Sequence, residues 1–391
     1  MLTTLTNHKT YCPLIEHGLY LERTDANTSK IGPCCAAIHE SAPNTQINFD
    51  TNTFLLRLRK ENRQGVKSAA CQSCYDNESF GAASLRTASV EYYNNFNNVK
   101  GLYNLDYNVD PICNAKCIIC SQQHSSAWLA EDIRDGMNAD LAIRTVASSR
   151  ANTIIETFDL SGLGRIYFNG GEPMLSDDPI KLLTKLKEIG RLGKVEVAFN
   201  MNGSVRPRPE FVELLKQAQS VTVFFSIDGV GEQFEYIRNP LKWSVLLETV
   251  QHVIELELPN LCVVSTCTVG VHNVDYVNDW HTWWHDYAEP IASRQTRHVP
   301  VKIISTVQRC TGPLDIMHAP IPVKQQWLEY LQQYQTSPWY SLVHGAVQNT
   351  LEQSDQSWKN QLDRLDIRRG NSWHQSLARF YQRCQTAGVV K

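Results

Sequence analysis

Apolar positions are distributed differently in three parts of the chain. From about residue 100, short apolar or alternating runs recur, with helix-like stretches between them. Six of these runs are predicted to be strands: Leu102–Val109, Arg165–Phe168, Val195–Phe199, Val221–Ile227, Cys262–Val269 and Val301–Ser305. Strands that alternate with helices predict an α/β protein with a parallel sheet built from βα units. Six units instead of eight predict a partial, TIM-like (β/α)6 barrel.

The segments between and around these runs complete the prediction. Helix-like stretches lie at Ser125–Val146, Pro179–Leu192, Glu210–Gln219, Leu241–Leu258 and Val274–Tyr287. Before residue 100 the periodicity is weak, apart from possible helices at Thr53–Asn62 and Ser79–Asn97. From Ile321 onward the spacing of apolar residues is helical. We therefore expect an irregular N-terminal domain over residues 1–99, a barrel over 100–310 and a helical C-terminal region over 311–391.

Composition limits the classes of partner and the cellular compartment that we expect for this protein. The net charge of −3 does not suggest a nucleic-acid or membrane partner. No apolar run is long enough to span a membrane, and the first residues lack the pattern of a signal peptide, so we expect a cytoplasmic protein without a membrane partner. The twelve cysteines of a cytoplasmic chain are not expected to form disulfides, and the clustering of eight of them in the first 120 residues points to metal binding.

Three of the cysteines have the spacing C-x3-C-x2-C directly after the first predicted strand. They are Cys113, Cys117 and Cys120. This loop is at the carboxyl end of the strand, where barrel active sites form. Three thiolates can ligate three irons of a [4Fe–4S] cluster and leave the fourth iron open. With His124 as a fourth ligand, the same cysteines could hold zinc, and the spacing alone leaves both metals open.

Further motifs follow the next strands in order. They are Asn169-Gly170-Gly171-Glu172-Pro173, Asn200-Met201-Asn202-Gly203, Ser226-Ile227-Asp228-Gly229 and Tyr236-Ile237-Arg238. Together with the cysteine spacing they resemble the radical S-adenosylmethionine (radical SAM) superfamily over roughly residues 100–310. A lone Gly-Gly-Glu could be an ordinary turn, but four elements at successive strand ends favour the family.

The resemblance implies the cofactors and the residues that bind them. Cys113, Cys117 and Cys120 would hold a [4Fe–4S] cluster, with S-adenosylmethionine on its open iron. The cofactor-binding residues would be Gly170, Gly171, Glu172, Asn200, Asn202, Ser226, Asp228 and Arg238. Among these, the glycine–glutamate stretch would meet the amino group of the methionine part, Ser226 the ribose and Arg238 the carboxylate.

A second set of cysteines lies near the N-terminus. Cys12, Cys71 and Cys74, with Cys34 or its neighbour Cys35, could fill a closed four-ligand site, and a structural zinc is the alternative. The pattern, with Glu78, Gly81 and Ser84-Leu85-Arg86 after it, resembles the SPASM or twitch auxiliary-cluster domain, here placed before the barrel. It implies a second [4Fe–4S] cluster for electron transfer or structure, and its spacing favours Cys34 over Cys35.

Among the remaining cysteines, Cys310 follows the sixth strand at the active-site end and is a candidate donor of a hydrogen atom to a substrate radical. Cys262, Cys267 and Cys384 are predicted to pack in the core.

The resemblance also implies the reaction. Reductive cleavage of S-adenosylmethionine would produce a 5′-deoxyadenosyl radical, which takes a hydrogen atom from a substrate. The auxiliary domain and the motifs at Ser226 and Tyr236 favour a peptide or protein substrate, with an external electron donor such as flavodoxin or ferredoxin. The alternatives are radical modification of a nucleotide, sugar or other small metabolite, and a non-enzymatic Fe–S or zinc-binding protein.

Overall fold

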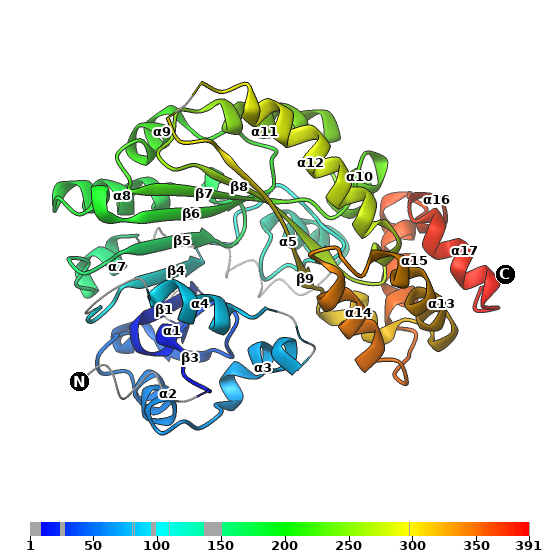
Figure 1. Cartoon of the computed structure of the whole chain (residues 1–391), viewed down its shortest axis with the longest axis horizontal. Helices are drawn as coiled ribbons and strands as arrows, with labels where there is room; N and C mark the ends of the chain where they lie inside the picture. The colour runs from blue at the N-terminus through cyan, green and yellow to red at the C-terminus, as the bar shows by residue number, and fades with distance from the viewer. Residues whose placement is uncertain are drawn as a thin grey trace.

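One mixed sheet organises the chain. The computed structural model describes residues 9–23, 28–79, 81, 83–94, 99–108, 110–136, 151–296 and 298–390. Within them, the sheet has nine strands in the order β3-β2-β1-β4-β5-β6-β7-β8-β9. Figure 1 shows this sheet curving around an open interior, with helices along its outer side and the C-terminal helices beyond β9.

The six predicted barrel strands are confirmed, and each pairs in parallel with the next. They are β4 (Asn104–Asn108), β5 (Arg165–Asn169), β6 (Glu196–Met201), β7 (Ser220–Ser226), β8 (Cys262–Val269) and β9 (Lys302–Arg309). Because β9 and β3 form the two ends of the sheet instead of pairing, the barrel is partial, as predicted.

The N-terminal region is more regular than expected. Its three strands are β1 (Gly18–Arg23), β2 (Thr28–Gly32) and β3 (Glu40–Pro43), and β1 pairs in parallel with β4. The prediction of an irregular region therefore needs correction, because strands of four to six residues are too short for their periodicity to stand out. The sheet runs across the boundary expected near residue 100.

The structure contains the predicted helices and additional short helices that were not predicted. In the N-terminal region they are α1 (Pro13–His17), α2 (Thr53–Arg63), α3 (Gln72–Ser79) and α4 (Leu85–Tyr93). The barrel helices are α5 (Ser126–Arg134), α7 (Ala151–Thr157), α8 (Asp178–Glu188), α9 (Pro209–Leu215), α10 (Glu232–Ile237), α11 (Trp243–Glu255) and α12 (Val277–Ser293). The predicted helix Ser125–Val146 is confirmed as far as Arg134, and its part beyond residue 136 lies outside the described residues.

The C-terminal region is helical, as predicted. It comprises α13 (Ile321–Leu331), α14 (Tyr340–Asn349), α15 (Ser357–Arg369), α16 (Trp373–Ser376) and α17 (Ala378–Thr386). Trp327, Trp358 and Trp373 are all fully buried among these helices. Among the described residues, no helix is both long and apolar enough to cross a membrane.

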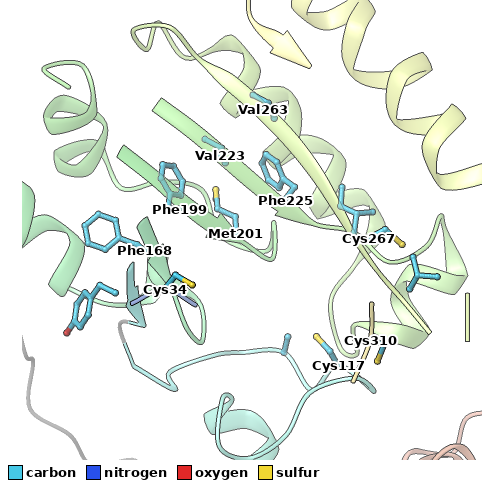
Figure 2. Close-up of a cluster of buried hydrophobic side chains, with 14 of the residues drawn as sticks. Cys34, Cys117, Phe168, Phe199, Met201, Val223, Phe225, Val263, Cys267 and Cys310 are labelled. Carbon is cyan, nitrogen blue, oxygen red and sulfur yellow. The ribbon is translucent and has the colours of Figure 1, made fainter. Parts of the chain in front are cut away.

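Alternation along the strands separates the core from the barrel interior. On β7, Val221, Val223 and Phe225 are completely buried under the outer helices, whereas Phe224 and Ser226 face the interior and are only half-buried. Figure 2 shows Val223 and Phe225 beside Phe199 and Met201 of β6 on this packed side. The apolar face stabilises the sheet and leaves the opposite face for a site.

Candidate active site at the carboxyl ends of the strands

The three-cysteine loop joins β4 to α5 and is held by the start of that helix. The hydroxyl of Ser125 caps α5 by accepting from the amide of Trp128 at 3.2 Å, and it donates to the carbonyl of Ala115 at 2.6 Å. The indole N–H of Trp128 donates to the carbonyl of Cys117 at 2.8 Å. These bonds set the path of the loop, so the helix cap positions the cysteines.

Two of the other sequence motifs form backbone hydrogen bonds with the same loop. The amide of Ile118 donates to the carbonyl of Ile237 at 2.8 Å, next to Arg238. From the other side, the amide of Gly171 donates to the carbonyl of Asp110 at 2.8 Å. A Cβ at Gly171 would lie 2.3 Å from the carbonyl oxygen of Ile112, so only glycine allows this approach.

A buried ion-pair cluster supports the loop from behind. The carboxylate of Glu131 on α5 is 2.7 Å from the Lys116 ammonium and 2.9 Å from the Arg369 guanidinium of α15. The Arg369 guanidinium also lies 4.6 Å from the centre of the Trp128 ring. Sequence reasoning missed this cluster, because Arg369 is 238 residues from Glu131 and has no local signal.

Burial and the nearby Arg238 guanidinium act in opposite directions on the charge of the cysteine sulfurs. Burial raises the pKa of Cys117 to about 12 and that of Cys120 to about 11. Without a metal these thiols therefore stay protonated at neutral pH, whereas a metal deprotonates a coordinating thiol. A guanidinium N–H of Arg238 points at the sulfur of Cys117, 3.8 Å away, and can stabilise it as a thiolate. The donor set fits a cluster held by Cys113, Cys117 and Cys120.

Glu172 is completely buried in the loop after β5. Its carboxylate accepts from the amide of Met174 at 3.1 Å and from the amide of Asn202 at 2.6 Å. It therefore ties the loops after β5 and β6 together. Burial raises the pKa of Glu172 to about 7, and the two amide bonds only partly offset this effect.

This shift predicts a pH dependence of stability. Because the pKa of Glu172 rises from 4.5 to about 7 on folding, the folded chain binds the proton more tightly than the unfolded chain. We expect the free energy of unfolding to fall by about 3 kcal/mol as pH rises from below 4.5 through 7, relative to Glu172→Gln. Urea unfolding of both chains over this pH range measures the difference, and parallel curves would contradict it.

Arg238 is paired inside the protein. Its guanidinium lies 2.6 Å from the Asp228 carboxylate, and both side chains are almost fully buried. Asp228 also accepts from the amide of Thr268 at 2.7 Å. The Nε of Arg238 is buried and has no hydrogen-bond partner among the described residues. This orphaned donor fits an anionic group, such as the carboxylate expected at Arg238 from the sequence.

Among the described residues, no three His, Cys, Asp or Glu side chains are placed to hold a metal ion without moving, whether the metal is zinc or iron. The imidazole of His124 lies instead 3.8 Å from the Glu22 carboxylate.

The N-terminal cysteines gather around one small cavity. Its lining includes Cys12, Cys34, Cys71 and Cys74 but not Cys35. The amide of Cys35 donates to Asp106 of β4 at 3.0 Å. The cavity volume is about 10 Å³, so these four thiols must move apart to hold a cubane. Their donor set fits a cluster with four protein ligands, with Cys34 in preference to Cys35.

A larger cavity of about 750 Å³ occupies the barrel interior. Its lining includes Tyr167, Asn200, Phe224, Ser226, Thr266 and Thr306 from the strands, and Ser73, Cys74, Asp76 and Asn77 from α3. Two predicted cofactor-binding residues, Asn200 and Ser226, thus face this space, and Cys74 lines both cavities.

Cys310 does not reach this cavity. It is 2% exposed, and its thiol lies 3.4 Å from the carbonyl of Thr311. Its neighbours Arg309 and Thr311 line the cavity. Figure 2 shows Cys310 at the same end of the barrel as Cys117 and Cys267. Its role as a hydrogen donor stays a prediction that would require the thiol to turn.

Residues 107–282 match the Radical SAM superfamily, which confirms the resemblance inferred from the motifs. No curated protein sequence matches the chain. Among solved structures, native anSMEcpe with bound AdoMet is similar at 15% identity and a TM-score of 0.40, and the match spans 59% of each chain. Streptococcus suis SuiB is similar at 11% identity and a TM-score of 0.36, over 81% of this chain and 68% of SuiB.

Proposed function

Because residues 107–282 match the radical SAM superfamily, we propose that the protein reductively cleaves S-adenosylmethionine and takes a hydrogen atom from a peptide or protein substrate. The single observation that carries this proposal is the three-cysteine loop at the carboxyl edge of the sheet. Backbone hydrogen bonds join this loop to the segments at Gly171 and Ile237. A [4Fe–4S] cluster there would supply the electron for cleavage, and S-adenosylmethionine would supply the radical.

Residues of this chain would bind the cluster and orient S-adenosylmethionine. Cys113, Cys117 and Cys120 would hold the cluster, and Arg238 would offer its free Nε–H to the carboxylate of S-adenosylmethionine. Asn200 and Ser226 line the interior cavity and would contact the rest of that molecule. The outer helices and the N-terminal region would keep water away from the reacting centre.

A peptide or protein substrate is supported by the motifs and by the size of the cavity. At about 750 Å³ the cavity is large enough for several side chains, and its lining includes residues of β9 and α3. The structure of SuiB bound to the precursor peptide SuiA concerns that protein, and it supplies the kind of substrate to try first. An external flavodoxin or ferredoxin would deliver the electron, and the N-terminal site would hold a second cluster.

The test is anaerobic reconstitution with iron and sulfide, followed by reduction in the presence of S-adenosylmethionine. We expect bound iron and the release of 5′-deoxyadenosine, measured by mass spectrometry. A folded chain that binds iron but forms no 5′-deoxyadenosine would refute the proposed activity. A substrate search with peptides and with small metabolites then decides between the two substrate classes.

A further inference from the structure

β9 is an edge strand of the sheet, and helix α14 packs near it. The strand has β8 as its one neighbour in the sheet, and all eight of its residues are at least partly exposed. In β8, by contrast, Val263, Val264, Cys267 and Val269 are buried. In the part of the chain that the structure describes, no other strand pairs with β9.

The hydrogen bonds to β8 show which amides of β9 are free. The amide of Lys302 donates to the carbonyl of Leu261 at 3.0 Å, and the amide of Cys310 donates to the carbonyl of Val269 at 2.8 Å. In a parallel pair, the backbone groups of alternate residues point to the same neighbour. The even-numbered residues therefore pair with β8, and the amides and carbonyls of Ile303, Ser305, Val307 and Arg309 point to the open edge.

The composition of β9 does not protect this edge. Edge strands in soluble proteins are usually blunted by charges, proline or bulges, because a long open edge recruits another strand. The six residues Ile303–Gln308 contain no charge and no proline. Charges stand only at Lys302 and Arg309, and Arg309 is paired with Asp315 at 2.9 Å.

The open edge borders the interior cavity. Thr306, Val307, Gln308 and Arg309 line this cavity, together with Ser226 deeper in the barrel and Asp76 on α3. β9 is the last strand of the sheet, and Figure 1 shows it next to the C-terminal helices. A chain lying along β9 would direct every second side chain toward the cavity, because strand side chains alternate.

We propose that an extended segment of the polypeptide substrate pairs with the open edge of β9 as a further strand and so presents a side chain to the interior cavity. Main-chain bonds to Ile303, Ser305 and Val307 supply affinity without regard to sequence, and the cavity selects the side chain. This inference rests on the peptide substrate of the proposed function and adds where such a substrate docks.

The test uses a matched pair of variants at Val307. Val307→Pro removes an amide that points to the open edge, where proline is tolerated because no ladder bond to β8 is lost. Val307→Ala trims the same side chain but keeps the amide. Peptides are selected from a random-peptide phage library on the anaerobically reconstituted enzyme. Their affinities for both variants are then measured, and thermal unfolding verifies that both fold.

We expect the selected peptides to bind Val307→Ala like the wild type and to bind Val307→Pro at least about tenfold more weakly. They should also slow hydrogen exchange at the amides of Ile303, Ser305 and Val307 in the wild type. Equal affinity for the two variants, no protection of β9, or failure to select any peptide would overturn the inference. A wild-type dimer that Val307→Pro alone dissociates would assign the edge to a second copy and also overturn it.

The same preparations separate this inference from the proposed function. If the wild-type enzyme forms no 5′-deoxyadenosine, the proposed activity fails, whatever binds to β9. If the wild type forms 5′-deoxyadenosine but the selected peptides bind both Val307 variants equally and do not protect β9, only the docking inference fails.

Discussion

Replacing Cys113, Cys117 and Cys120 together with alanine is expected to lower the bound iron from about eight to about four atoms per chain and to abolish release of 5′-deoxyadenosine. The loop keeps its path without the thiols, because Ser125 and Trp128 hold its backbone. The variant therefore loses the cluster that cleaves S-adenosylmethionine, while the N-terminal cysteines still bind iron. Colorimetric iron analysis and mass spectrometry after anaerobic reconstitution measure both quantities.

The N-terminal pair Cys34 and Cys35 provides the matched control. Cys34→Ala should lower the N-terminal iron, because Cys34 lines the cavity shared with Cys12, Cys71 and Cys74. Cys35→Ala should retain it, since the neighbouring thiol lies outside that cavity. If the triple variant kept all its iron, or if Cys35→Ala lost as much iron as Cys34→Ala, the assignment of ligands would be wrong.

Breaking the Asp228–Arg238 pair is expected to destabilise the protein by about 3–5 kcal/mol, because one charge then stays buried without its partner. Arg238→Met removes the cation and leaves the Asp228 carboxyl in place. Urea unfolding of the iron-free chain measures the loss. Binding of S-adenosylmethionine to the reconstituted variant should weaken as well, since the guanidinium is the proposed contact for its carboxylate.

The double variant Asp228→Leu/Arg238→Met tests the physical reason. Removing both charges should recover much of the stability lost in Arg238→Met, because no uncompensated ion stays in the core. It should not recover binding of S-adenosylmethionine. Burial already raises the pKa of Asp228 in the wild type, so loss of Arg238 should raise this pKa further. The folded Arg238→Met variant then binds its proton more tightly than the unfolded chain, and its stability should fall with rising pH. A double variant as unstable as Arg238→Met would contradict this account.

Through the ion-pair cluster at Glu131, the C-terminal helices contact the segments that form the site. Arg369 of α15 reaches the helix that follows the cysteine loop, and Gln361 of the same helix lies 3.5 Å from the carbonyl of Ile118. The hydroxyl of Tyr236 donates to Asp366 of α15 at 3.0 Å. The C-terminal region therefore braces both the cysteine loop and the segment that precedes Arg238.

The amino-acid sequence by itself determined the features that depend on local spacing. The C-x3-C-x2-C loop and the motifs at Glu172, Asn202 and Asp228 each follow a strand, and parallel strands end at one edge of a sheet. Periodicity was therefore sufficient to predict the partial barrel and to predict that these residues lie at one end of it. The helical C-terminal region was equally clear, because its apolar spacing is sustained over several turns.

Only the tertiary structure decided the features that depend on contacts between distant segments. The pairing of β1 with β4, the separation of Cys34 from Cys35 and the reach of Arg369 to Glu131 leave no periodic trace in the chain. The open edge of β9 is of the same kind. An edge strand and a central strand have the same local pattern, and only the order of strands in the folded sheet tells them apart.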